Sequence, residues 1–401
     1  MNLVSVNIES IQLGQPLPFV LRGSDGALLA KKGYVVRSRD ELATLVAGGR
    51  DLCVDTDESG DSYRAYLAQL QRMLNSSDTS LGEIAAMKMT AAEDPVARPR
   101  GRVLPEWPEL QLRLTQLFRS PSPADFGPRF RALLDELVRH SENTPDAALL
   151  ALVYLSAQEE RMYSATHAML VACACMVVAR ESFRWPAARV QVLGAAALSM
   201  NIGMAELQDQ LAQQSLPLTA QQMAAVENHP ERSEALLRQL GVGDPVWLEA
   251  VRCHHHRTPG PLSGKSEAQQ MARLIQRADV FGARLAPRAA RLPMPVTAAM
   301  QASYYDEQQK VDEAGASLVK TLGVYPPGSF VRLASKEIGV VIRRGASATT
   351  PRVAVLTNRD GMPTGEPIPR DTSAAAWKIA GVVAARDVRV KIPLDRLLAL
   401  A

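Results

Sequence analysis

The feature of this 401-residue sequence that most constrains its fold is a long block of helical periodicity between residues 121 and 322. Apolar side chains recur there three and four positions apart, as in Phe130, Leu134 and Leu137, which places them on one face of a helix. Few segments within the block have the alternating pattern of a strand. We therefore predict a single helical domain over residues 121–322.

The segments on either side of this block have β-rich patterning. Residues 1–55 alternate short apolar runs with turn residues, and residues 323–401 contain four further apolar runs. The strands expected in the C-terminal segment are 329–333, 338–342, 353–356 and 388–392. Residues 56–120 are rich in helix breakers and predict a linker with helical islands. The predicted fold class is α+β, with a central all-helical domain flanked by small β-rich N-terminal and C-terminal segments.

Charge and hydropathy exclude several classes of protein. The 45 basic and 42 acidic side chains give a formal charge of +3, without the strongly basic balance of a nucleic-acid-binding protein. The longest apolar stretch, residues 168–179, is shorter than the roughly 20 residues that cross a bilayer, and the N-terminus has no signal pattern. The side chains of Cys173 and Cys175 would point in different directions on a helix, so we predict that both are reduced core residues. We predict a cytoplasmic protein with no membrane span and no nucleic-acid partner.

All six histidines lie within the helical block. They are His140, His167, His229, His254, His255 and His256. Imidazole is the commonest metal ligand, and neighbouring histidines can serve one ion where a helix end lets their rings converge. Consecutive helical side chains point about 100° apart, so the run at residues 254–256 fits a solvated surface equally well.

The order of several separated motifs resembles that of HD-GYP domains. These motifs are Tyr163 with His167, residues 198–203, His229 with Pro230, His254 with His255, and Ala278 with Asp279. The resemblance covers roughly residues 157–322 and continues into residues 323–328, and the β-rich N-terminal segment is similar to a small domain found ahead of many such modules. It implies a bacterial helical metallohydrolase fold that hydrolyses cyclic di-GMP with two or three metal ions, commonly iron or manganese.

The chain differs from the family at the positions that bind and bridge the metal ions. The signature His-Asp pair falls at Met200 and Asn201, and the lysine expected after Gly203 is Met204. A thioether is a weak ligand for a hard ion, and a neutral amide lacks the charge of a metal-bridging carboxylate. His256 stands in place of the family's glutamate, and residues 262–264 stand in place of Gly-Tyr-Pro. The resemblance therefore implies a degenerate catalytic site at Met200, Asn201 and Met204.

Five family ligands survive and define the candidate metal site. They are His167, His229, His254, His255 and Asp279. This set implies one divalent ion, iron or manganese; the alternative is that these residues are former ligands, now hydrogen-bonded in a polar cleft. Arg288 and Arg291 match an Arg-x-x-Arg motif that implies contact with the messenger's phosphates, although a solvated surface pair is an equal alternative.

Three functions remain open. We favour a catalytically degenerate HD-GYP-like signalling protein, not itself an enzyme, that binds cyclic di-GMP or signalling proteins. The first alternative is a metal-dependent cyclic di-GMP phosphodiesterase with a reduced metal site. The second alternative is a structural scaffold that binds no nucleotide.

Overall fold

The computed structural model describes parts of residues 1–55 and most of residues 107–401. The described residues are 3–5, 13, 17, 20–24, 26–31, 34–36, 38, 41, 52–55, 107–157, 162–289, 291–388, 390 and 392–401. Residues 56–106 of the predicted linker lie outside them. The chain forms two compact units, Met1–Val103 and Leu104–Ala401. The boundaries predicted from the sequence remain predictions.

The N-terminal unit contains a small antiparallel sheet. Its strands are β1 (Leu3–Ser5), β2 (Leu21–Gly23), β3 (Leu28–Ala30) and β4 (Leu52–Asp55). They are ordered β1-β4-β2-β3, and Val54 pairs with Leu21 in the register of β4 against β2. Leu21 and Val54 are fully buried, so this sheet has an apolar interior, as the turn-separated apolar runs predict.

The second unit begins with a helical core. Its helices are α4 (Trp107–Arg119), α5 (Phe126–Asn143), α6 (Pro145–Ser156), α7 (Tyr163–Glu181), α8 (Ala187–Ser199), η2 (Ile202–Met204), α9 (Ala205–Gln213), α10 (Ala220–Glu227), α11 (His229–Gln239), α12 (Pro245–Cys253), η3 (Leu262–Gly264), α13 (Glu267–Leu285), α14 (Val296–Tyr304) and α15 (Glu313–Leu322). Helix α4 lies in the range predicted as linker with helical islands, and its buried face contacts α5, α7 and α9.

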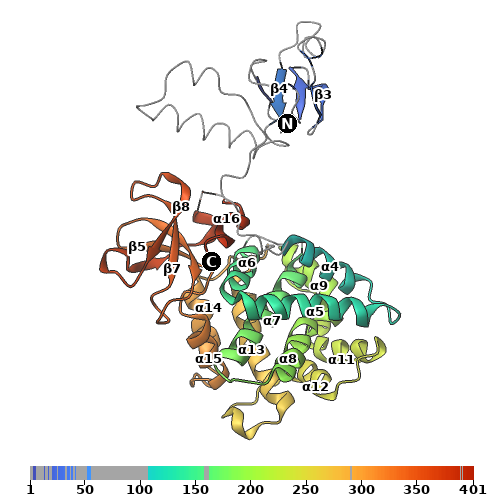
Figure 1. The fold of residues 1–401 in the computed structure, drawn as a ribbon. Helices are drawn as coiled ribbons and strands as arrows, with labels where there is room; N and C mark the ends of the chain where they lie inside the picture. Colours follow the sequence, from blue (N-terminus) through green and yellow to red (C-terminus); the bar gives the residue numbers. More distant parts are fainter. Residues whose placement is uncertain are drawn as a thin grey trace. The chain divides into compact units, whose positions relative to one another are not determined.

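Helix α7 is the centre of this core (Figure 1). Its side chains are buried from Tyr163 to Ala179, and it contacts α4, α5, α6, α8, α9, α13 and α15. Helix α8 crosses α7 closely at Gly194, where a Cβ atom would lie 2.6 Å from Sδ of Met176. Cys173 and Cys175 are buried and free, as predicted.

Two stretches are long and apolar enough to cross a membrane by length and composition alone. They are Tyr163–Glu181, whose apolar window is 94% buried, and Ala187–Gln213, whose window is 67% buried. A helix that is apolar on all sides is also what the centre of a helical core requires. Packing within this unit therefore accounts for the composition of both stretches.

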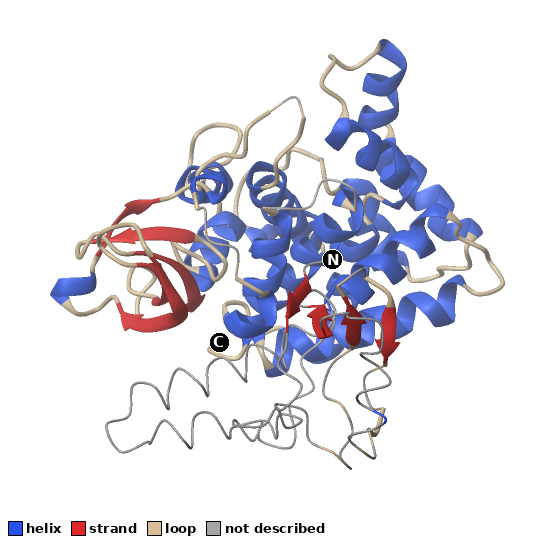
Figure 2. Ribbon diagram, turned by 90° about the horizontal axis from the view of Figure 1, so that it is seen from above, coloured by secondary structure: helices blue, strands red, loops and turns tan. Residues whose placement is uncertain are grey.

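The C-terminal segment forms an antiparallel sheet, which lies beside the helices in Figure 2. Its strands are β5 (Phe330–Leu333), β6 (Ile338–Arg343), β7 (Arg352–Thr357), β8 (Pro363–Asp371) and β9 (Ile379–Val382), in the order β8-β7-β6-β5-β9. Short helices follow the last two strands: η4 (Ala375–Trp377), η5 (Ala385–Asp387) and α16 (Leu394–Leu398). The α+β class is confirmed.

Three of the four predicted C-terminal strands are confirmed, and the fourth is wrong. The described residues of the range 388–392 are not in a strand, and β9, which pairs with β5, ends before them. The sequence pattern also missed β8, because Pro363, Pro367 and Pro369 argue against a strand. Strand β8 is at the sheet edge, where a proline removes no ladder hydrogen bond.

The sheet is attached to the helical core by apolar packing and by one arginine. Phe330 and other residues on one face of the sheet join the helical core, and the Phe330 ring lies 6.0 Å from that of Tyr154. Arg344 follows β6 and donates to Asp146 at 2.5 Å. It also donates two hydrogen bonds to Glu181, at 2.7 and 2.9 Å. One guanidinium thus connects the sheet to α6 and α7.

Replacing this guanidinium should weaken the attachment of the sheet. We expect Arg344→Gln to lower the free energy of unfolding by about 2 kcal/mol, because the partly buried Asp146 and the exposed Glu181 both lose their partner. Chemical unfolding followed by circular dichroism measures the change. The control is Arg359→Gln, whose side chain is 78% exposed and whose only ion pair is with Asp360 within the described residues. Equal losses in both variants would contradict this assignment.

Candidate metal centre

Three histidines converge from two neighbouring helices. His229 is the first residue of α11, and His254 and His255 follow the last residue of α12. Their ligand atoms all lie within 4.8 Å of one another. His229 and His254 are buried, whereas His255 is exposed. The end of α12 lets the two consecutive rings turn toward His229, which a continuous helix would not allow.

Backbone carbonyls fix how two of these rings present their nitrogens. Nδ1 of His229 lies 2.6 Å from the oxygen of Val226, and Nδ1 of His254 lies 2.5 Å from the oxygen of Val251. A carbonyl oxygen only accepts, so Nδ1 carries the proton in both rings. Each neutral ring then has a lone pair on Nε2, and the two Nε2 atoms face each other at 3.1 Å. Two facing lone pairs require a shared proton or a cation between them.

Burial keeps this pair neutral. Burial, together with the neighbouring His255 and His229, lowers the pKa of His254 to about 3. Burial likewise lowers the pKa of His229, despite the carbonyl of Val226. A shared proton is therefore disfavoured near neutral pH, and a metal cation is a group that could satisfy both nitrogens.

The donor set fits a single divalent ion. An ion held by nitrogens at roughly 2.0–2.1 Å in tetrahedral geometry separates its ligand atoms by roughly 3.4 Å, close to the spacing of the two Nε2 atoms. Metal-binding histidines also commonly donate their second N–H to a carbonyl oxygen, as His229 and His254 do here. His229, His254 and His255, named below as the histidine cluster, could hold such an ion.

The two remaining predicted ligands, His167 and Asp279, are hydrogen-bonded to each other. Nε2 of His167 on α7 lies 2.7 Å from Oδ1 of Asp279 on α13. The other ring nitrogen, Nδ1, is buried and has no hydrogen-bond partner among the described residues. It lies against Gly282, where a Cβ atom would approach Nδ1 to 3.1 Å. Asp279 therefore engages Nε2 of His167, whereas Nδ1 has no hydrogen-bond partner within the described residues.

The pair is close enough to the histidine cluster to be coupled with it electrostatically. Burial alone would raise the pKa of Asp279, but the hydrogen bond from His167 and the nearby His255 and His254 hold that pKa well below its usual range. The structure thus brings the five predicted ligands into one region, as a cluster of three and a pair of two. Their part in metal binding remains a prediction.

The residues predicted to replace the family signature lie at the end of α8 and in η2, which contacts α11. Met200 is fully buried at the end of α8, and Asn201 is buried immediately after it. Oδ1 of Asn201 has no hydrogen-bond partner within the described part of the chain. The backbone N–H of Gly203 donates to Ser233 Oγ at 3.0 Å, which holds η2 against α11. Met204, at the end of η2, is half-buried.

The predicted arginine pair makes internal contacts. Arg288 donates to the hydroxyl of Tyr163 at 2.8 Å, and its guanidinium lies 5.0 Å above that ring. The Tyr163 ring in turn stacks on His167 at 5.6 Å. Arg291 donates to the carbonyl of Ala283 at 2.6 Å. Sequence patterns could not show that Arg288 supports the His167 ring through Tyr163, because the contact joins residues 125 positions apart.

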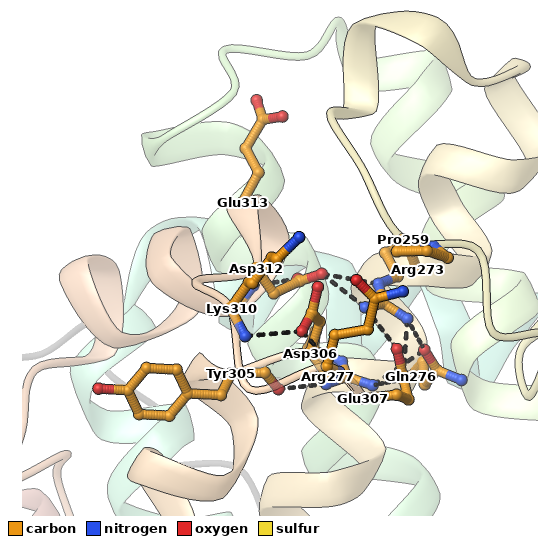
Figure 3. A network of polar contacts seen from close by, with 12 residues as sticks. Pro259, Arg273, Gln276, Arg277, Tyr305, Asp306, Glu307, Lys310, Asp312 and Glu313 are labelled. Atoms are coloured by element: carbon orange, nitrogen blue, oxygen red, sulfur yellow. Dashed lines mark hydrogen bonds and ion pairs between the residues drawn. The ribbon is translucent and has the colours of Figure 1, made fainter.

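A polar pocket of about 690 Å³ opens beside the histidine cluster and is lined in part by His255, α13 and α14. One wall is a network of ion pairs (Figure 3). Arg273, with a side chain only 1% exposed, donates to Glu307 at 3.0 and 3.1 Å and to Asp312 at 2.8 Å. Arg277 adds a 2.7 Å hydrogen bond to Glu307. The network attaches the segment between α14 and α15 to α13, and no sequence pattern predicted it.

Comparison with known proteins identifies a curated relative. No protein-family model matches the sequence. Over 229 residues the chain is 28% identical to a cyclic di-GMP phosphodiesterase of Pseudomonas aeruginosa, an alignment that covers 56% of this chain and 54% of that protein. The curated relative is thus a cyclic di-GMP phosphodiesterase, in agreement with the resemblance seen in the sequence motifs. It spans about half the length of the curated relative that it matches.

A solved structure is also similar to this chain. It is an HDG"Y"P protein of Bdellovibrio bacteriovorus, at a TM-score of 0.40 and 14% identity. The match covers 79% of this chain and 98% of that one.

The histidine cluster predicts stabilisation by a divalent ion. Manganese at one hundred times its dissociation constant should stabilise the folded protein by about 2.7 kcal/mol, because the unfolded chain has no assembled site. Thermal unfolding with Mn²⁺ or chelator measures this shift. His254→Gln should abolish it, whereas the exposed neighbour variant His256→Gln should retain it. Equal shifts in both variants would place the ion elsewhere.

The ion-pair network predicts an acid-sensitive contribution to stability. Partial burial would raise the pKa of Glu307, but hydrogen bonds and charge from Arg273 and Arg277 outweigh it and lower the pKa to about 2. Because the folded pKa lies below the unfolded value of about 4.3, this stabilisation is complete above that value and is lost as the pH falls through about 2.

Glu307→Gln should therefore flatten the fall in unfolding free energy between about pH 4.5 and 3. Urea unfolding across this range is the measurement. The exposed variant Glu366→Gln is the control and should keep the wild-type slope. A Glu307 variant with the wild-type slope would show that the ion pairs contribute nothing measurable.

Proposed function

We propose that this protein is a catalytically degenerate HD-GYP-like signalling protein. It binds one divalent ion, iron or manganese, at the histidine cluster and recognises cyclic di-GMP in the adjoining pocket. Signalling proteins are its further partners, and the bacterial cytoplasm is its location. Similarity to a cyclic di-GMP phosphodiesterase supports the choice of ligand.

The observation that carries this proposal is the opposed pair of Nε2 atoms in His229 and His254. Their tautomers are set by Val226 and Val251, their pKa values are lowered, and their lone pairs face each other at 3.1 Å. This arrangement is suited to a cation and would be unfavourable for two hydrogen-bonded former ligands. A bound ion would supply positive charge next to a phosphodiester.

The proposed absence of hydrolysis follows from the residues that would have to hold a second ion. Hydrolysis by two metal ions needs a second ion to stabilise the leaving oxygen. The residues available for it are the mutually hydrogen-bonded His167 and Asp279, a buried thioether at Met200 and a neutral amide at Asn201. None of these supplies a bridging carboxylate.

The pocket supports binding of a ligand without its hydrolysis. Its volume of about 690 Å³ falls within the range of small-molecule sites, roughly 300–1,000 Å³. Its lining combines His255 of the histidine cluster with arginine, glutamine and tyrosine side chains. A dinucleotide offers phosphates and base edges that match these groups.

The phosphodiesterase with a reduced metal site is the second candidate. The retained histidine cluster and the activity named for the Pseudomonas aeruginosa relative both favour it. A structural scaffold that binds neither metal nor nucleotide is the third.

One set of measurements separates the three functions. Metal analysis and calorimetric titration of cyclic di-GMP are combined with a turnover assay in Mn²⁺ or Fe²⁺. We expect one ion per chain, binding of cyclic di-GMP, and no hydrolysis above background. Robust turnover that is lost in His254→Gln would establish the phosphodiesterase, and absence of metal and nucleotide binding would establish the scaffold.

Restoring the signature should restore the second ion. The double change Met200→His with Asn201→Asp supplies an imidazole and a carboxylate beside the His167–Asp279 pair, and metal analysis should show about two ions per chain. Met204→Lys alone is the matched control and should leave the content at about one. Hydrolysis is expected only when the double change is combined with Met204→Lys and His256→Glu.

If the double variant keeps the metal content of the wild type, the signature has been assigned to the wrong residues. Circular dichroism of each variant excludes misfolding as the reason.

A further inference from the structure

The pocket beside the histidine cluster contains more positive charge than its ion pairs use. Four of its lining residues carry cationic or ionisable nitrogen groups: His255, Arg257, Arg277 and Arg284. Its acidic side chains are Asp306 and Glu307. The charge that remains for a ligand depends on which of these groups already have partners.

Both acidic side chains have partners within the protein. Glu307 accepts hydrogen bonds from Arg273 and Arg277 (Figure 3). Asp306 accepts from the backbone N–H groups of Gln308 and Lys310, both at 2.8 Å. Among the described residues, neither carboxylate forms an ion pair with Arg257 or Arg284.

Two guanidiniums remain without an acidic partner. Arg257 follows the histidine cluster and is exposed, and Arg284 on α13 is half-buried and donates to the carbonyl of Val280 at 3.2 Å. Within the described ranges neither forms an ion pair. They enter the pocket from separate segments, one after α12 and one from the last turn of α13.

The arginines of the Arg-x-x-Arg motif are placed differently. Arg288 is engaged with the hydroxyl and ring of Tyr163, and Arg291 with the carbonyl of Ala283. Neither lines the pocket. The motif therefore supports the His167 ring and the turn after α13, whereas the pocket has a different arginine pair.

We infer that Arg257 and Arg284 bind the phosphate groups of a dinucleotide in this pocket, an inference that rests on the proposed function. Guanidinium groups recognise phosphate oxygens through paired, charge-assisted hydrogen bonds. The same pocket offers the amides of Gln301 and Gln309 and the ring of Tyr305, which suit base edges and base faces. His255 places the phosphates next to the histidine cluster.

The test is calorimetric titration of the full-length protein with four probes: cyclic di-GMP, its linear dinucleotide, cyclic di-AMP and GTP. We expect Arg257→Gln and Arg284→Gln each to weaken dinucleotide binding about tenfold, and the double variant about a hundredfold. Arg288→Gln and Arg291→Gln are matched controls that remove the same charge and should change affinity less than threefold. Arg257→Lys and Arg284→Lys keep the charge and should lose less than the glutamine variants.

The outcomes separate this inference from the proposed function. If cyclic di-GMP binds and only the Arg288 and Arg291 variants weaken it, the inference is wrong and the receptor function stands. If another dinucleotide binds through Arg257 and Arg284 while cyclic di-GMP does not, the inference stands and the proposed ligand is wrong. If the wild-type protein binds none of the four probes, both are overturned.

Discussion

Burial of α7 is the constraint on which the rest of the helical unit depends. Because almost every side chain from Tyr163 to Ala179 is excluded from solvent, this helix must be covered on all sides, and the surrounding helices do so. Gly194 lets α8 approach closely enough to close the packing. The same requirement fixes the first turn of α7, which carries Tyr163 and His167, in the interior.

This packing places the histidines and Asp279 with little freedom to move. His167 is held between Asp279, Gly282 and the Tyr163 ring, which Arg288 holds in turn. His229 is oriented by the carbonyl of Val226 in α10, and His254 by that of Val251 in α12. Orientation by backbone carbonyls and packing explains the metal-compatible geometry of the histidine cluster.

The two halves of the region have different chemical consequences. The Nε2 atoms of His229 and His254 in the histidine cluster face each other, whereas Nε2 of His167 is engaged by Asp279. Under the function proposed above, the histidine cluster would hold one ion next to a phosphate without the second ion that two-metal hydrolysis requires. Arg277, which lines the pocket, is paired with Glu307, so the guanidiniums of the lining without an ion pair among the described residues are Arg257 and Arg284.

The sequence by itself determined the α+β class, the helical block and three C-terminal strands, because 3.6-residue and two-residue periodicities are local properties of the chain. Motif order determined the relationship to HD-GYP proteins and the candidate ligands, since residue type limits chemistry.

Only the tertiary structure decided how those ligands divide. In the structure, three histidines form a cluster and His167 pairs with Asp279. Arg288 contacts Tyr163, whereas Arg257 and Arg284 line the pocket. Strand β8 also forms from a proline-rich segment at a sheet edge. These features depend on contacts between residues far apart in the chain, and the distance between such residues is set by packing and not by local pattern.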